Sequence, residues 1–411
     1  MDFTFFHELL SIDSTSGKER KVAEWLVERL PAMFPEGNRP DFRVDEVGDG
    51  TLNLLLTWGT PRIVFCSHLD TVPPYLPPVF PEGIGVSEPS LRDPSHGKPW
   101  APPSYAAEGG HRFGDPYALR NATIRGRGSC DAKGQVFAMV TACQRLAKEG
   151  CSGFGLLLLA GEETGSWGAK AFAKTDFRAE YLVVGEPTDN CMVSASKGTK
   201  SFDLTFTGEP FHSGYPEFGV SAVDLFVEFV NKLKAKDFGM DPVLGETTWN
   251  IGLLRSDNPQ NILSPELTCR LYFRTTFVSD EAVSVWMTAV GRPEEDTVSG
   301  AFARTEPPQK SEIFGDPGLS RSDAEETVSS SGRIAVTARG GDTPARYWTL
   351  DGIPSKSVAF GSDAPHLKNF PHKAICGPGS ITVAHRDDEH VRLSDLETAV
   401  EQYVSMFKRC T

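Results

Sequence analysis

Hydrophobic positions follow two patterns in residues 1–198. Some segments are short, almost continuous apolar runs of strand length, whereas others repeat apolar residues every three or four positions, as one face of a helix does. In residues 18–30, for example, Val22, Trp25 and Leu26 share one such face. Alternation of apolar strands and helices is typical of an α/β fold whose mostly parallel sheet is covered by helices. The predicted strands are 51–58, 62–70, 154–161 and 179–186. One predicted helix starts near the N-terminus and ends near residue 10, and three others span 18–30, 134–150 and 167–174.

The pattern changes after Lys200. Alternating strands and amphipathic helices then follow in the order βαββαβ, which is that of a ferredoxin-like unit. After Pro307 the α/β pattern resumes, and it ends in a helix over 393–410. We therefore expect a split α/β domain at 1–198 and 308–411, interrupted by a small α+β domain at 199–307. The predicted elements of the inserted domain are strand 201–208, helix 220–236, strands 248–256 and 266–276, helix 279–291 and strand 296–306.

Residues 73–116 do not fit this alternation, because they hold eleven of the thirty prolines and show little periodicity. A long irregular stretch inside a compact domain is either functional or mobile. The serine run Ser329–Ser331 and its neighbours are predicted to form a mobile loop.

Composition agrees with a globular protein of two domains, since 411 residues exceed one ordinary core and 39% of them are hydrophobic. The net charge of −14 disfavours nucleic acid and anionic membranes as partners. The eight cysteines form no CxxC pair, which predicts buried thiols in a reducing cytoplasm. The first residues lack the pattern of a signal peptide, and no apolar run approaches the length of a membrane span.

The run LLLLAGEETGSWG at 156–168 places the most apolar stretch of the chain directly before two acidic residues, Glu162 and Glu163. Adjacent carboxylates repel each other, and the rim of a core would also desolvate them in part. Either they point into open water or a cation lies between them.

Other polar side chains also follow predicted strands or loops. Ligand sites in open α/β sheets gather at the carboxyl ends of the strands. Taken singly, each candidate is more often a structural histidine, a helix cap or a solvated carboxylate. Together they form a set of histidines and carboxylates that suits zinc and, less exclusively, manganese or cobalt. The candidates are His68, Asp70, Asp131, Glu162, Glu163, Glu186, His385 and His390.

Neighbouring candidates could have different roles, one as a metal ligand and the other as its orienting group or as a general base. His68 and Asp70 lie two apart on a strand and share a face, so Asp70 could hold the second ring nitrogen of a metal-binding His68. Of Glu162 and Glu163, one could bind metal while the other faces a metal-bound water as general base. Other chemistries have little support, because the sequence contains no GxSxG elbow and no GxxxxGK[ST] phosphate loop.

These residues stand in five motifs, SHLDTVPP, GRGSCDAKG, GEETGS, GEPT and AHRDDEH, which follow one another along most of the chain. In motifs and order the sequence resembles the di-zinc amidohydrolases that include acetylornithine deacetylase, succinyl-diaminopimelate desuccinylase, aminoacylase and glutamate carboxypeptidase. The resemblance implies an α/β catalytic domain and an inserted ferredoxin-like lid and dimerisation domain. It also implies a homodimer formed through the inserted domain.

The resemblance assigns a role to each motif. It implies that Asp131 bridges two zinc ions and precedes a cis peptide bond, that Asp70 orients a ligand and that Glu162 is the general base. Cobalt or manganese could replace zinc. One zinc would be held by His68, Asp131 and Glu186, and the other by Asp131, Glu163 and His385.

Three further roles are implied in the inserted domain. His212 would polarise the scissile carbonyl, often in the site of the partner subunit, and Asn261 and Arg274 would hold the carboxylate of the substrate. Arginine suits that role because its planar fork grips a carboxylate with two hydrogen bonds. The alternatives are a histidine on the lid surface and an arginine in an ion pair on the sheet surface.

The run GPGSITVAHRDDEHV at 377–391 looks most like acetylornithine deacetylase and its acyl-citrulline relatives. It implies an N-acyl amino acid as substrate and a role such as arginine biosynthesis. The alternatives are a dipeptidase or carboxypeptidase, a succinyl-diaminopimelate desuccinylase, and an inactive binding homologue. His68 and Asp131 are 63 positions apart, which exceeds the usual spacing of the family, and the proline-rich segment accounts for the excess.

Overall fold

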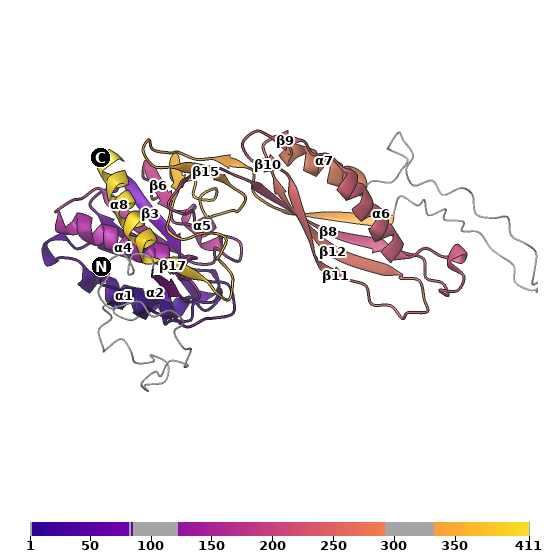
Figure 1. Ribbon diagram of the computed structural model, residues 1–411, viewed down its shortest axis with the longest axis horizontal. Coiled ribbons are helices and arrows are strands. Elements are labelled where there is room, and N and C mark those ends of the chain that lie inside the picture. The colour runs from indigo at the N-terminus through magenta and orange to yellow at the C-terminus, as the bar shows by residue number, and fades with distance from the viewer. Residues whose placement is uncertain (1, 82–83, 85–121, 292–332, 411) are drawn as a thin grey trace, which may run out of the picture. The chain divides into compact units, whose positions relative to one another are not determined.

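The computed structural model describes residues 2–81, 84, 122–291 and 333–410, which form two compact units (Figure 1). The first unit comprises Met1–Ala195, Arg346–Ser357 and Ser362–Thr411. The second comprises Ser196–Ala345 and Val358–Gly361. The α/β chain is thus split around an insertion, as the change of periodicity predicted.

A six-stranded sheet forms the centre of the first unit. Strands β3, β5, β6 and β16 are parallel, and β1 and β2 extend the sheet on the β5 side in antiparallel pairing. Every residue of β3 and β5 is buried, as expected for continuous apolar runs. The order is β1 (Asp41–Val47), β2 (Thr51–Trp58), β5 (Phe154–Leu159), β3 (Ile63–His68), β6 (Tyr181–Val184) and β16 (His372–Ile375).

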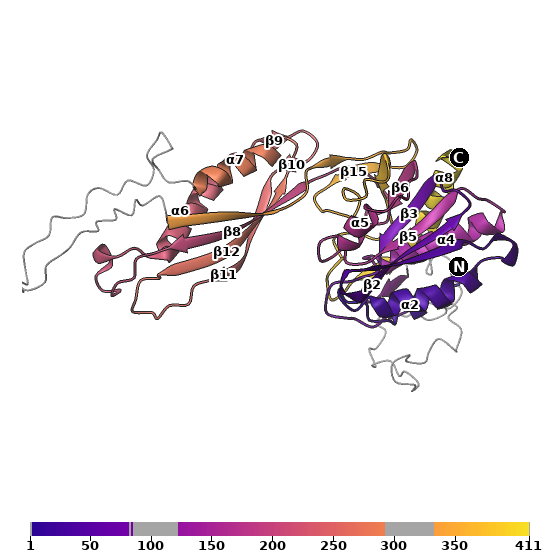
Figure 2. The same cartoon turned by 180° about the vertical axis from the view of Figure 1, so that it is seen from behind.

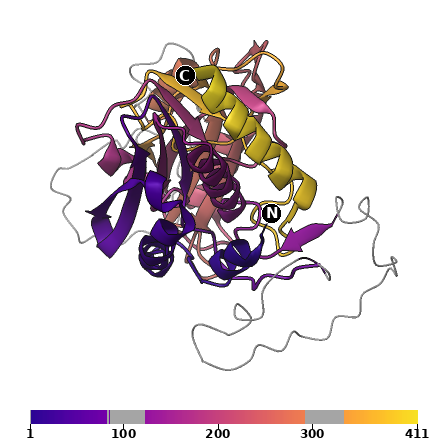
Figure 3. The ribbon, with the colours of Figure 1, turned by 90° about the vertical axis from the view of Figure 1, so that its left-hand side faces the viewer.

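Helices and aromatic side chains complete the core of this unit. Helices α4 and α8 pack against each other and against β3 (Figure 3). Phe137 of α4 stacks on Phe6 with ring centroids 4.8 Å apart. Phe154 of β5 lies between Trp58, at 4.4 Å, and Phe407, at 5.5 Å. The helices are α1 (Thr4–Leu10), α2 (Arg20–Arg29), α4 (Lys133–Lys148), α5 (Trp167–Phe172) and α8 (Leu393–Cys410).

Several short strands were not expected from the sequence. Strand β1 was missed because most of its residues are polar and at least partly exposed. Strands β4 (Thr123–Arg125) and β17 (His390–Arg392) pair with each other. Strand β7 (Met192–Ser196) was not expected either, and it forms a three-stranded sheet with β14 (Ala345–Arg346) and β15 (Ser355–Val358). The segments of β14 and β15 lie where the α/β pattern was predicted to resume.

The second unit is an antiparallel sheet packed against two helices (Figure 2). Its strand order β11-β12-β8-β13 and element order βαββαβ are those of a ferredoxin-like fold, which confirms the predicted fold class. Burial alternates along β12, whose inner face contributes Leu271 and Phe273 to the core. The main elements are β8 (Gly198–Thr207), α6 (Ala222–Ala235), β11 (Thr248–Arg255), β12 (Glu266–Thr275), α7 (Asp280–Val290) and β13 (Ile334–Gly340), and β9 (Met240–Asp241) pairs with β10 (Gly245–Glu246).

The last strand of this unit differs from the prediction. The expected strand 296–306 lies outside the described residues, as do Ser329–Ser331 and most of the proline-rich segment. Strand β13 instead pairs with β8, from Ile334 opposite Phe206 to Gly340 opposite Ser201. The second unit therefore extends to Ala345, beyond the predicted boundary at residue 307.

All eight cysteines carry free thiols. Among the described helices, none combines the length and apolar character that crossing a bilayer requires.

Candidate metal centre

Parallel strands bring three segments of the candidate site to one edge of the sheet. His68 is the last residue of β3 and lies opposite Leu159, the last residue of β5. Cys66 of β3 pairs with Val184, the last residue of β6. Glu162 and Glu163 follow β5 within four residues and Glu186 follows β6 within two, so the sheet register itself gathers these side chains.

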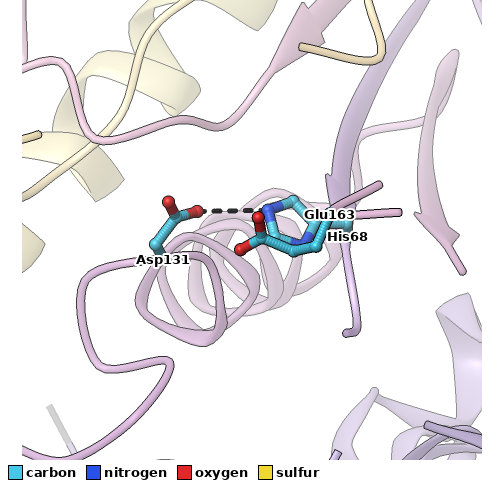
Figure 4. Close-up of side chains that lie close together, drawn as sticks. All are labelled: His68, Asp131 and Glu163. Atoms are coloured by element: carbon cyan, nitrogen blue, oxygen red, sulfur yellow. Dashed lines mark hydrogen bonds and ion pairs between the residues drawn. The ribbon is translucent and has the colours of Figure 1, made fainter. Parts of the chain in front are cut away.

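Asp131 and His385 reach the same place from loops. Asp131 precedes α4, and the Asp131–Ala132 peptide bond is cis, as the resemblance implied. The Oδ1 atom of Asp131 lies 3.1 Å from Nε2 of His68, and its Oδ2 atom lies 3.3 Å from Nε2 of His385. His385 Nε2 is also 3.0 Å from Oε1 of Glu163. Figure 4 shows His68, Asp131 and Glu163 converging, and their ligand atoms lie within 4.8 Å of one another.

These separations suit ligands that share a cation. A tetrahedral zinc ion with bonds of about 2.0–2.1 Å holds its ligand atoms about 3.3 Å apart. Each oxygen of Asp131 faces a different histidine, as a carboxylate between two cations would. Glu186 Oε1 is buried and has no hydrogen-bond partner among the described residues, so it remains available as a ligand. The donor set therefore fits metal ions.

Burial and charge shift the protonation of this cluster strongly. Burial raises the pKa values of the Glu162 and Glu186 carboxyls well above their usual range, and neighbouring carboxylates add to this effect. Hydrogen bonds to Asp131 and Glu163 raise the pKa of His385 to about 10. Although burial opposes it, hydrogen bonds to Asp131 and Asp70 raise the pKa of His68 as well. Without a cation, protons thus compensate the negative charge of the cluster.

Asp70 holds two segments of the site at once. The Nδ1 atom of His68 lies 2.9 Å from the main-chain oxygen of Asp70 and 3.4 Å from its Oδ1 atom. The Asp70 carboxylate accepts hydrogen bonds from the backbone N–H groups of Glu162, at 3.0 Å, and Glu163, at 3.2 Å. Ser16 Oγ donates to it at 2.8 Å. Asp70 therefore fixes the backbone of both glutamates in addition to facing His68.

The sequence did not indicate Ser16 as part of the site, because it lies 54 positions from Asp70 along the chain. The sequence did not indicate Asp363 as part of the site either. Its carboxyl is fully buried, and burial raises its pKa to about 6, against the opposing effects of His68 and Ser166.

Four predicted residues lie on other elements than those of the cluster. His390 belongs to β17, and its Nδ1 lies 2.8 Å from the main-chain oxygen of Asp388. His212, Asn261 and Arg274 lie in the second unit. There the exposed His212 accepts a hydrogen bond at Nδ1 from the Gly214 backbone.

Asn261 and Arg274 have different surroundings within that unit. The main-chain oxygen of Asn261 accepts from the Ser213 N–H at 2.9 Å, so the predicted carboxylate-binding segment adjoins His212. The Arg274 guanidinium lies 5.1 Å from the centre of the Tyr272 ring.

Comparison with known proteins identifies the family. Residues 103–409 match the family model described as Peptidase family M20/M25/M40. The chain belongs to this peptidase family. It is therefore a metal-dependent amidohydrolase, which agrees with the donor set at the end of the sheet.

Relatives and solved structures of the M20 family extend over nearly the whole chain. A "Probable carboxypeptidase" of Aspergillus terreus is 29% identical over 437 residues, covering 97% of this chain and 84% of the relative. A tripeptidase from Staphylococcus aureus shares the fold with a TM-score of 0.67 at 17% identity, covering 98% of this chain and 96% of that one. The M20 family metallo-carboxypeptidase Sso-CP2 of Sulfolobus solfataricus has a TM-score of 0.62 at 14% identity, with 100% and 99% covered.

The raised pKa values of the two histidines predict that metal binding releases protons. At pH 8 the metal-free protein carries a proton on His385, whose pKa is about 10, and the raised pKa of His68 favours its protonated form too, whereas metal ligation requires neutral imidazoles. The apparent affinity for zinc should therefore rise between pH 6 and pH 9. Titration calorimetry in buffers of different ionisation enthalpy should show release of about one proton or more per chain. A binding heat independent of the buffer would contradict this prediction.

Proposed function

We propose that the protein binds two zinc ions and hydrolyses the amide bond of a small substrate that carries a free carboxylate. The observation that carries this proposal is the Asp131 carboxylate, whose two oxygens face His68 and His385 separately. One zinc would be held by His68, Asp131 and Glu186, and the other by Asp131, Glu163 and His385. Cobalt or manganese could replace zinc, because nitrogen and oxygen ligands also suit these ions.

When bound, the metal ions would polarise the scissile carbonyl and lower the pKa of the attacking water. In this proposal Glu162 takes a proton from that water and returns it to the leaving amine. Burial raises the pKa of the Glu162 carboxyl, which favours accepting a proton, and the charge of the cations would bring that pKa down again. His212 would donate a hydrogen bond to the developing oxyanion.

Replacing the proposed base tests this division of roles. Glu162→Gln should retain metal, since Glu162 is not a proposed ligand, and should lower kcat by about 10²–10⁴-fold. Glu397→Gln makes the same substitution at an exposed position of α8 and should leave both metal content and kcat unchanged. Zinc analysis with steady-state kinetics measures both quantities. Near-normal turnover by Glu162→Gln would remove Glu162 from the mechanism.

Two substrate classes fit the same chemistry. We place an N-acyl amino acid first, because residues 377–391 resemble acetylornithine deacetylase and its acyl-citrulline relatives. The second candidate is a short peptide cleaved before its C-terminal residue, and the name of the Aspergillus terreus relative favours it. Both present a carboxylate that Asn261 and Arg274 would bind.

A substrate panel distinguishes these classes. Amine release should be measured for N-acetyl and N-succinyl amino acids, succinyl-diaminopimelate included, and for dipeptides. Each substrate should also be tested with its carboxylate converted to an amide. We expect the amide forms to lose about tenfold or more in kcat/KM, and Arg274→Lys to reduce this preference, because lysine cannot form the bidentate pair. Equal rates for acid and amide forms would contradict the proposed role of Arg274. Less than one zinc per chain without turnover would favour the inactive homologue.

The second unit supports the proposal of a homodimer. Strand β11 lies at the edge of its sheet, and edge strands readily pair with another chain. Leu253 and Leu254 on this strand are exposed, as are Val223 and Val227 on α6. A second copy that covered these side chains would remove apolar surface from water. We also propose a cytoplasmic location, since the eight cysteines carry free thiols.

A charged residue on this edge tests the dimer. Leu253→Asp should convert the protein to a monomer in light scattering coupled to size exclusion, because pairing would bury the new carboxylate. Val44→Asp, at an exposed position of β1 in the first unit, is the matched control and should remain dimeric. A dimeric Leu253→Asp, or a monomeric unmodified protein, would exclude this interface.

A further inference from the structure

Glu389 is a buried carboxylate whose two oxygens have separate partners. Only 1% of the residue is exposed. Its Oε2 atom accepts from Nη1 of Arg127 at 2.5 Å, and Arg127 is equally buried. Its Oε1 atom accepts from three backbone N–H groups, those of Gly128 at 2.9 Å, Cys130 at 3.1 Å and Asp131 at 3.1 Å.

The three N–H groups belong to the loop that carries Asp131. Successive backbone N–H groups of a curved loop form a concave site for an anion, and a buried N–H group without an acceptor destabilises the conformation that exposes it. Glu389 supplies this anion from a segment about 260 residues away along the chain. The loop conformation that aims the Asp131 carboxylate at His68 and His385 therefore depends on an acceptor from a distant part of the sequence.

The same residue connects this loop to the segment of His385. The main-chain oxygen of Glu389 accepts from Gly126 N at 3.1 Å, just before the Asp131 loop. Arg127, paired with Glu389, also donates from Nη1 to the main-chain oxygen of Arg386, the neighbour of His385, at 3.2 Å. Glu389 and Arg127 thus fasten together the two segments that carry Asp131 and His385.

We propose that Glu389 is a positioning residue that holds the Asp131 loop and the His385 segment in the metal-binding geometry before metal arrives. The inference rests on the proposed two-metal function. It adds a residue that touches neither the substrate nor the metal ions and acts through Asp131. Groups that orient metal ligands in this way typically change metal affinity by 10–100-fold when they are mutated.

Glu389→Gln is the decisive variant because it keeps the shape of the side chain. An amide offers an acceptor on one side only, so either the backbone N–H groups or Arg127 must face the amide NH₂ group. In a titration of metal-free protein with Co²⁺, the affinity for at least one ion should fall by about 10-fold or more, and the visible absorption of bound Co²⁺ should change. Asp388→Asn removes one negative charge at the preceding residue, which is exposed, and should titrate with Co²⁺ like the unmodified protein.

The titration separates the possible outcomes. If the unmodified protein binds no Co²⁺, the proposed metal function fails. If it binds two ions and folded Glu389→Gln binds them with equal affinity, the positioning role alone is overturned, even if the variant melts at a lower temperature.

If Glu389→Gln does not fold, hydrogen exchange of the unmodified protein tests the positioning role instead. Hydrogen exchange of a peptide spanning 126–131 should be slow in metal-free protein, because Glu389 already holds its N–H groups. Fast exchange that slows only when Co²⁺ is added would show that the metal, and not Glu389, organises the loop, and would overturn the proposal.

Discussion

Mutual repulsion of buried carboxylates is the constraint on which the site depends. Five carboxylates meet at the carboxyl edge of one sheet, where burial strengthens the interactions between charges. Those of Asp70, Asp131 and Glu186 are buried, and those of Glu162 and Glu163 are half-buried. Without cations, bound protons reduce this negative charge, because the pKa values of Glu162, Glu186 and the two histidines are raised. Metal ions would compensate the same negative charge, and we expect each bound ion to displace protons.

Two loops of the site are held in the same way, by a carboxylate that accepts hydrogen bonds from their backbone N–H groups. Asp70 accepts the backbone N–H groups of Glu162 and Glu163, and Glu389 accepts those of the Asp131 loop. In both cases an acidic side chain that is not itself a proposed ligand fixes the backbone of a segment that carries one, Glu163 in the first case and Asp131 in the second. The sheet brings the segments to the same edge, and these carboxylates determine where their side chains point.

Much of this arrangement could be predicted from the sequence. Strands β3 and β5 are continuous apolar runs, so their burial and parallel pairing follow from local pattern. The ends of such strands meet at one edge, which is enough to group His68 with Glu163 and Glu186 from the sequence alone. Two strands could not be located in this way. The sequence placed the last strand of the second unit at residues outside those described, whereas β13 pairs with β8. The polar residues of β1 gave no strand pattern, because β1 forms by pairing with β2 and not by burial of an apolar run.

By itself, the sequence determined the element types, the split of the α/β chain and the residue types that a metal-dependent hydrolase requires. These properties depend on hydrophobic period and on side-chain chemistry, which are local. Tertiary structure alone decided that Ser16 reaches Asp70 and that Glu389 accepts from the Asp131 loop. Those contacts join residues 54 and 258 positions apart, and no local pattern records which distant acceptor a buried N–H group will find.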